Sequence, residues 1–220
     1  MAEGAVNVFT HLPVAQGSPE WRQARCGKIT GSRADAIAKR LKNGAVSSDW
    51  HTYLRELVVE RLTGKVEEGV TSRDMDRGIE LEPYARSAYE GKTGYLVEQV
   101  GLFVSTALPD VACSVDGYIA GANRIVEIKC PRAGKVLAML EDGGTCRVPE
   151  EYRWQIAHNL HVTQASACDL VLFCPDLPEH LRLTVLSCLP TDVDDYLIRL
   201  MDFRAELQRK EEYWRTYGEW

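Results

Sequence analysis

The chain has 220 residues, of which 45% are hydrophobic and 26% are charged, a composition typical of a globular protein and unlike that of a disordered or fibrous one. At about 150 residues per domain, this length favours one elaborated domain. Lys and Arg number 26 against 32 Asp and Glu, a net charge of −6. This excludes a histone-like protein that coats DNA, but not a protein that holds DNA in a local basic cleft.

The termini and cysteines indicate the compartment. The N-terminal segment lacks a basic stretch followed by an apolar core, and no run approaches about 18 apolar residues. We therefore expect no secretory leader, no membrane span and a cytoplasmic location. No CxxC pair occurs, so we expect free, mostly buried thiols in a reducing compartment rather than disulfides, zinc or an iron–sulfur cluster. The cysteines are Cys26, Cys113, Cys130, Cys146, Cys168, Cys174 and Cys188.

The first part of the chain has helical patterns. Ser18 before Pro19 predicts a helix start, and this short helix continues to Arg25. The later helices are predicted at 32–41, 48–63 and 74–90, where apolar residues recur at helical spacing and glycines follow the ends.

The pattern then becomes rich in β-formers. Strands are predicted at 95–104, 110–119, 123–130, 167–174 and 181–188, and helices at 134–141, 149–163 and 192–216. We expect one α/β domain over 1–220, with a central mixed sheet flanked by helices. Its parts are a helical N-terminal subregion (18–94), a catalytic sheet core (95–190) and a C-terminal helix (191–220).

One strand of the core carries charged residues among apolar ones. Glu127 and Lys129 lie two apart, so they point to the same face of the 123–130 strand. Asp116 precedes Glu127 across a tight connection, and a hairpin would bring the two carboxylates together. A divalent cation would relieve their repulsion, and hard oxygen ligands favour Mg²⁺ or Mn²⁺ over zinc. The carbonyl of Ile128 is a further candidate ligand, and the whole set suits metal-assisted phosphodiester hydrolysis.

A plainer interpretation is also available. Glu127 and Lys129 could form a solvated pair on an edge strand, with Asp116 and Gly117 merely in a turn. Glu82, in the preceding helix, makes a functional cluster the better interpretation.

The Asp116, Glu127 and Lys129 pattern resembles the PD-(D/E)xK nuclease signature. Further segments resemble, in order and spacing, those of the phage lambda exonuclease and YqaJ-like viral recombinase family of alkaline exonucleases. They are EWRQARCGKITGS (20–32), RGIELEPYAR (77–86), ACSVDGY (112–118), VEIKCP (126–131) and YRWQIAHNLHVT (152–163). The resemblance covers roughly residues 18–175 and implies a restriction-endonuclease-like core.

The resemblance also implies roles for Asp116, Glu127, Lys129 and Glu82, which together are called the acidic cluster. Asp116, Glu127 and the Ile128 carbonyl would bind two Mg²⁺ ions, with Mn²⁺ as the alternative. Lys129 would position or activate the attacking water. Glu82 matches a helical glutamate that supports the second metal, and Glu80 is a neighbour on the same helix with which it could be confused.

Other matched positions imply a DNA-end site. Arg25, Ser32, Ser114 and Gln155 match residues that hold a 5′-phosphate, a role that suits a guanidinium and neutral donors. Met75, with Arg73 nearby, falls where an apolar wedge splits the terminal base pair.

Each match has a structural alternative. Arg25 could be a helix-end cation, Ser32 only an N-cap, and Ser114 an ordinary strand residue. Gln155 could be a surface side chain, Glu82 a solvated carboxylate and Met75 core filler. His158 stands where the lambda enzyme has a tyrosine, and we expect His158 and His161 to be packed or surface histidines rather than ligands.

The predicted activity is a metal-dependent 5′→3′ exodeoxyribonuclease. It would digest one strand of linear duplex DNA to mononucleotides, leaving a 3′ overhang for single-strand-annealing recombination. The resemblance implies a homotrimeric ring, a 5′-phosphorylated duplex as substrate and a single-strand annealing protein as partner. The alternatives are an endonuclease or RecB-like nuclease of the same fold, or a non-catalytic module that binds DNA ends.

Overall fold

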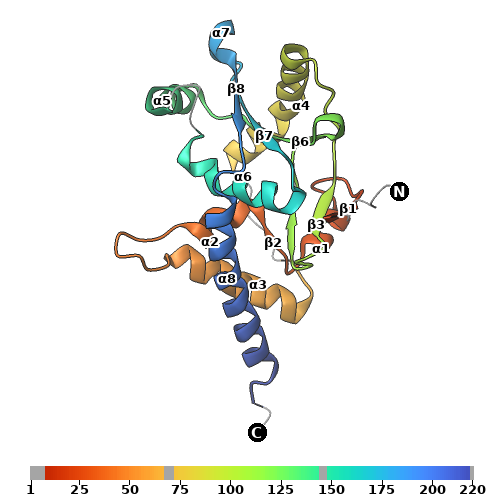
Figure 1. Cartoon of the computed structure of the whole chain (residues 1–220), viewed down its shortest axis with the longest axis vertical. Coiled ribbons are helices and arrows are strands. Elements are labelled where there is room, and N and C mark those ends of the chain that lie inside the picture. The colour runs from red at the N-terminus through yellow and green to blue at the C-terminus, as the bar shows by residue number, and fades with distance from the viewer. Residues whose placement is uncertain (1–7, 67–71, 144–147, 219–220) are drawn as a thin grey trace, which may run out of the picture.

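The computed structural model describes residues 8–66, 72–143 and 148–218 (Figure 1). Its helices and strands confirm the predicted α/β fold class. Cys146 lies outside these ranges, as do the last two residues of the predicted 191–220 region. No helix in the described ranges is long and apolar enough to cross a membrane.

The N-terminal half is mainly helical. Its elements are β1 (Phe9–Leu12), α1 (Pro19–Arg25), β2 (Ile29–Thr30), a short 3₁₀ turn η1 (Gly31–Arg33), α2 (Ala34–Ala38), α3 (Ser48–Thr63) and α4 (Arg73–Thr93).

The second half holds most of the strands. Its elements are β3 (Leu102–Ser105), β4 (Val111–Cys113), β5 (Gly117–Ile119), η2 (Ala120–Ala122), β6 (Arg124–Lys129), α5 (Ala133–Gly143), α6 (Glu150–Thr163), β7 (Ala167–Phe173), α7 (Glu179–Arg182), β8 (Leu183–Cys188) and α8 (Val193–Arg215).

Local capping explains where the N-terminal helices begin. The side chains of Ser18, Ser47 and Ser72 each accept a hydrogen bond from a backbone N–H of the first turn of α1, α3 and α4. Such bonds satisfy N–H groups that have no partner within the helix. Gly64 and Gly94 end α3 and α4 in the left-handed conformation, with φ of 67° and 74°.

Several predicted boundaries are wrong. The strand expected at 95–104 begins only at Leu102, and the strand expected at 110–119 is split into β4 and β5. The helix expected at 32–41 is replaced by η1 and α2, which ends at Ala38. Two short strands, β1 and β2, were not predicted because four and two residues carry too little periodicity to stand out.

The strands form two four-stranded sheets rather than one central sheet. Their orders are β1-β3-β4-β2 and β5-β6-β7-β8. The chain passes from the first sheet to the second between β4 and β5, at residues 114–116. Within the second sheet, β6 pairs antiparallel with β5 and parallel with β7.

Helices cover both faces of the second sheet. On one face, Ala85 and Tyr89 of α4 pack in a cluster with Val126 and Ile128 of β6. On the other, α6 belongs to the main core, which includes Ile125 of the same strand. In Figure 1, α6 lies across the centre of the molecule, with α2, α3 and α8 below it. Any polar residue of β6 on the α6 face must therefore find partners inside the core.

The six cysteines within the described ranges are free. Cys113, Cys168, Cys174 and Cys188 are buried, whereas Cys26 and Cys130 are half-buried. Burial raises the pKa of Cys113 and Cys168, which therefore remain protonated, unreactive thiols.

Candidate active site

Strand β6 carries two charged side chains on its α6 face. Glu127 and Lys129 share this face, and Lys129 Nζ lies 2.7 Å from Glu127 Oε1. Glu127 is 2% exposed, and β6 is an inner strand of its sheet. The alternative of a solvated pair on an edge strand is therefore wrong.

The sequence predicted Asp116 inside a strand. In the structure it lies in the bend before β5. Since Gly117 pairs with Val126, the antiparallel register brings Asp116 beside Glu127. Its Oδ2 accepts a 2.7 Å hydrogen bond from the backbone N–H of Ile128. Burial and the charge of Glu127 raise the pKa of Asp116 well above its ordinary value.

Two amides from α6 complete the surroundings of Glu127. Gln155 Nε2 donates to Oε1, and Asn159 Nδ2 donates to Oε2 at 2.9 Å. Gln155, predicted at the 5′-phosphate, thus contacts the acidic cluster instead of solvent. Asn159 was missed, although its position four residues after Gln155 on a helix would have placed both on one face.

Lys129 is held as an ammonium. Burial alone lowers its pKa, but the charges of Glu127 and Asp116 raise it above the ordinary value. A protonated Lys129 suits the orientation of water and the stabilisation of developing negative charge better than proton abstraction.

Glu82 reaches the same cluster from α4. It forms an ion pair with Arg86, one turn later on the helix. Arg86 Nη2 also donates to the backbone oxygen of Asp116 at 3.2 Å. The charge of Glu82 further raises the pKa of Asp116. Glu80 is exposed, so the structure separates it from the glutamate beside the cluster.

The oxygen atoms of the acidic cluster fit a magnesium ion better than a softer metal. Within the described ranges, no three His, Cys, Asp or Glu side chains converge closely enough to hold a metal by themselves. Mg²⁺ typically uses one or two carboxylates and keeps several waters. Asp116 and Glu127, with the backbone carbonyl of Ile128, match that requirement.

Two of the predicted phosphate ligands, Ser32 and Ser114, lie around the guanidinium of a third, Arg25. Arg25 donates to the hydroxyls of Ser114 at 3.2 Å, Thr30 at 3.2 Å and Ser32 at 3.3 Å. Trp21 Nε1 donates to Ser114 at 2.8 Å, and the Arg25 guanidinium lies 4.3 Å from the Trp21 ring centroid. Ser32 therefore binds Arg25 rather than capping a helix, and Thr30 and Trp21 are additions that sequence patterns did not indicate.

The loop after α1 fixes Arg25 against α3. Gly27, with φ of +68°, donates to Glu60 Oε2 at 2.7 Å and accepts from Arg61 Nε at 2.8 Å. A Cβ at Gly27 would lie 2.8 Å from Arg61 Cγ, so glycine is required by both conformation and space.

Met75 and Arg73 lie in the first turn of α4 and are exposed. Met75 is 54% exposed, so it is not core filler. In a helix of 3.6 residues per turn, Met75, Ile79 and Glu82 lie on one face. An apolar stripe thus extends from the acidic cluster toward the start of α4.

His158 is a core residue. Its ring nitrogens lie 2.8 Å from the Tyr196 hydroxyl and 2.8 Å from the Ala112 carbonyl oxygen. Burial lowers the pKa of His158 to about 4 and also lowers the pKa of His161. His158 thus links α6 to α8 and to β4 as a neutral imidazole.

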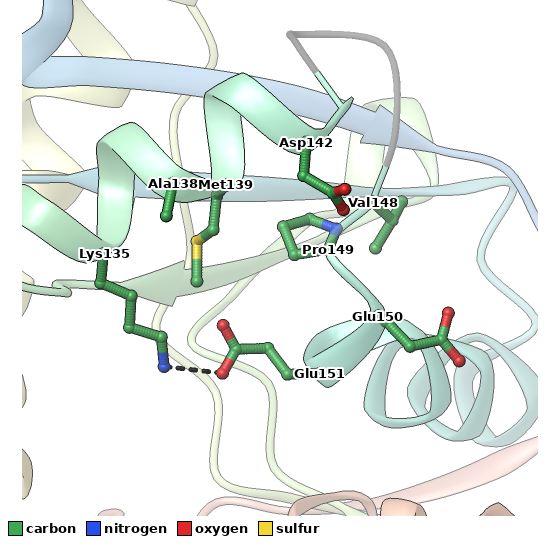
Figure 2. A pocket seen from close by; sticks show the side chains of 8 residues that line it. All are labelled: Lys135, Ala138, Met139, Asp142, Val148, Pro149, Glu150 and Glu151. Carbon is green, nitrogen blue, oxygen red and sulfur yellow. Dashed lines mark hydrogen bonds and ion pairs between the residues drawn. The ribbon is translucent and has the colours of Figure 1, made fainter.

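A separate hollow of about 290 Å³ lies between α5 and α6 (Figure 2). Lys135 and Glu151 form an ion pair at 2.6 Å on its rim. Its lining includes none of Asp116, Glu127 and Lys129, and none of the side chains around Arg25. The hollow is therefore distinct from the candidate active site.

Comparisons with known proteins find one matching family model and several similar solved structures. The model of the YqaJ-like viral recombinase domain matches residues 20–166. The structure resembles an alkaline exonuclease (LHK-Exo) from Laribacter hongkongensis, with 29% identity, a TM-score of 0.81, and coverage of 92% of this chain and 98% of that one. The complex of LHK-Exo with dAMP gives 29% identity, a TM-score of 0.82 and the same coverage.

A more distant structure shares the fold. A phage-related exonuclease from Haemophilus somnus 129PT has 12% identity and a TM-score of 0.65, covering 86% of this chain and 95% of that one. A comparison with curated protein sequences finds no match. Because the domain model spans most of the chain and includes Arg25, Glu82, Asp116, Glu127 and Lys129, this protein belongs to the YqaJ-like viral recombinase family.

Proposed function

We propose that this protein is a metal-dependent 5′→3′ exodeoxyribonuclease acting on linear duplex DNA. The observation that carries the proposal is the convergence of Asp116, Glu127 and Lys129 on one buried face of β6. The similarity to an alkaline exonuclease, together with its complex with a mononucleotide, supports release of mononucleotides from an end.

In this mechanism, Asp116, Glu127 and the Ile128 carbonyl would hold two Mg²⁺ ions, and Glu82 would support the second. The bound metal would lower the pKa of a water and neutralise charge on the scissile phosphate. Lys129 would orient the attacking water and stabilise the developing negative charge. Gln155 and Asn159 hold the Glu127 carboxylate in place.

The cluster around Arg25 receives the 5′-phosphate of the end being digested. Its guanidinium and the hydroxyls of Ser32 and Ser114 supply the donors that a phosphate requires. Met75, with Arg73, separates the terminal base pair so that one strand reaches the acidic cluster. The product is a duplex with a 3′ single-stranded overhang, the substrate of a single-strand annealing protein.

The proposed assembly is a homotrimeric ring around DNA, as in the family that the sequence resembles. A ring reconciles DNA binding with a net charge of −6, because a basic lining can coexist with an acidic exterior. Sedimentation velocity tests this directly: a species of three times 24.7 kDa is expected, whereas a monomer at all concentrations contradicts the ring.

The activity is tested on linear duplex with a 5′-phosphate and a label on each strand in turn, in Mg²⁺ or EDTA. We expect mononucleotides from the 5′-ended strand only, none in EDTA, and at least about a 100-fold loss in Lys129→Met. Lys135→Met is the matched control, since Lys135 pairs with Glu151 outside the cluster.

Covalently closed circular duplex separates the alternatives. An exonuclease leaves it intact, whereas cleavage of the circle would identify an endonuclease. Absence of hydrolysis with Mg²⁺ and with Mn²⁺, combined with binding to duplex ends, would instead identify a non-catalytic module.

A further inference from the structure

Asn159 is a buried polar side chain with only half of its amide satisfied. It is 1% exposed, and its Nδ2 donates to Glu127 Oε2 at 2.9 Å. Among the described residues, its Oδ1 has no hydrogen-bond partner. A buried amide oxygen without a partner is costly, so this placement requires a compensating reason.

The unpaired oxygen of Asn159 lies against Gly31. A Cβ built on Gly31 would lie 2.3 Å from Asn159 Oδ1 and 3.2 Å from His158 Cδ2. The absence of a side chain at position 31 therefore leaves the room that the Asn159 amide fills. The φ of Gly31 lies outside the left-handed region, so space rather than backbone conformation requires glycine here.

The two neighbours of Gly31 belong to the group of Arg25, Thr30, Ser32 and Ser114, which is called the phosphate cluster. Thr30 and Ser32 both accept hydrogen bonds from Arg25 Nη2. The Asn159 amide is therefore wedged between Glu127 on one side and the segment 30–32 on the other. It connects the acidic cluster to the phosphate cluster through one rigid side chain.

We propose that Asn159 is a positioning residue that sets the separation between the acidic cluster and the phosphate cluster. This inference rests on the proposed function. With the separation fixed, a phosphate held by Arg25 places the first phosphodiester bond of the strand at Asp116 and Glu127. The 5′-phosphate then accelerates hydrolysis only while Asn159 and Gly31 keep their packing.

Three variants test this: Asn159→Ala removes the wedge, Asn159→Leu keeps a similar shape without the donor, and Gly31→Ala pushes the wedge away. The readout is the ratio of hydrolysis rates on 5′-phosphate and 5′-hydroxyl ends, with kcat and KM for each. We expect the ratio and kcat on phosphorylated ends to fall at least tenfold, with KM for 5′-hydroxyl ends unchanged. A merely structural defect would lower both rates equally and leave the ratio intact.

A double variant checks the contact itself. Once Asn159 is replaced by alanine, the further change Gly31→Ala should lower the ratio less than twofold, because Oδ1 is gone. Gly121→Ala, whose Cβ meets nothing within 4 Å, is the control. If Gly31→Ala lowers the ratio a further tenfold in the Asn159→Ala background, direct contact between the two residues is contradicted.

Binding measured in EDTA adds a readout that needs no catalysis. Fluorescence anisotropy should show tighter binding of 5′-phosphorylated than 5′-hydroxyl duplex by the wild type, with the difference reduced in Gly31→Ala. If Gly31→Ala fails to fold, Asn159→Ala, which removes the wedge, carries the test. A wild type without phosphate preference overturns the proposed phosphate site. A wild type with that preference and variants that retain it overturn only the role of Asn159.

Discussion

His158 links three elements through both ring nitrogens, and its pKa is lowered to about 4 by burial. In the unfolded chain a histidine takes up its proton near pH 6.5. The unfolded state therefore binds more protons between these values, and stability falls as pH decreases from about 6.5 to 4. Each pH unit in this window removes at most about 1.4 kcal/mol.

The variant His158→Gln isolates this effect, because an amide can still donate to the Ala112 carbonyl but does not titrate. Urea unfolding at pH 7.5 and pH 5 gives the free energy of unfolding of both proteins. The difference between wild type and variant should shrink as the pH falls. A difference that is independent of pH would contradict a neutral, buried His158.

We expect Asp116 to lower the stability of the metal-free protein. Its carboxylate is buried beside Glu127, and its pKa is raised by burial and by that charge. Asp116→Asn retains an oxygen for the Ile128 N–H and removes the repulsion. We expect a higher thermal midpoint than the wild type in EDTA at pH 8, together with loss of hydrolysis. A lower midpoint would show that the carboxylates do not strain the metal-free protein.

At the scale of elements, the pairing of β1 with β3 depends on Gly101. A Cβ there would lie 2.2 Å from the Leu12 carbonyl oxygen and 2.6 Å from that of Val14. Since backbone cannot move as a flexible side chain does, Gly101→Ala should destabilise the fold by about 1–3 kcal/mol. Gly121→Ala meets open space and should leave the urea midpoint nearly unchanged. Equal stability of both variants would contradict the β1 packing.

The apolar stripe of α4 allows a test of the proposed end wedge. Met75 and Ile79 lie on the face of Glu82, whereas Tyr84 lies about 200° around the helix from Glu82. Met75→Ala should slow digestion of blunt ends by about tenfold, because unstacking a base step costs a few kcal/mol. Ends that are already frayed should be digested at the normal rate. Tyr84→Ala, at a position 65% exposed, is the control.

The same elements show what sequence patterns can predict. α3 has the predicted bounds, since apolar spacing and Gly64 define both ends. The spacing of Asp116, Glu127 and Lys129 predicts their proximity, because it depends on a local hairpin and strand alternation. Thr30 escapes prediction because no local pattern marks its hydroxyl as a partner of Arg25. Trp21 and Asn159 escape it because they join the clusters through contacts distant in sequence. The bend at Asp116 ends β4 early for the same reason: its side chain bonds the backbone of β6.

At the scale of the molecule, Asp110 ties the sheet to two helices. It accepts hydrogen bonds from Arg61 of α3 and Arg204 of α8, and these offset burial and lower its pKa. Arg61 also pairs with Glu211 of α8 at 3.1 Å. Asp110→Ala should cost about 2–3 kcal/mol, since it removes charge-assisted bonds to two arginines and leaves Arg204 without its partner carboxylate, whereas Arg61 keeps Glu211.

The matched control is Arg209→Ala, which breaks an exposed ion pair with Glu206 on the same helix. Such pairs contribute little to stability, so its urea midpoint should equal that of the wild type. If Asp110→Ala behaves like Arg209→Ala, the bonds of Asp110 do not contribute to holding α8 against the sheet.

The space shared by Gly31 and Asn159 also constrains how this sequence can diverge. A side chain at position 31 would collide with the amide at 2.3 Å, whereas a smaller residue at position 159 would open that space. Substitutions at the two positions should therefore be accepted in one order, with 159 changing before 31. A library randomised at position 31 and selected for folded, protease-resistant protein would reveal this order. Glycine alone should survive in the wild-type background, and several small residues should survive in the Asn159→Ala background.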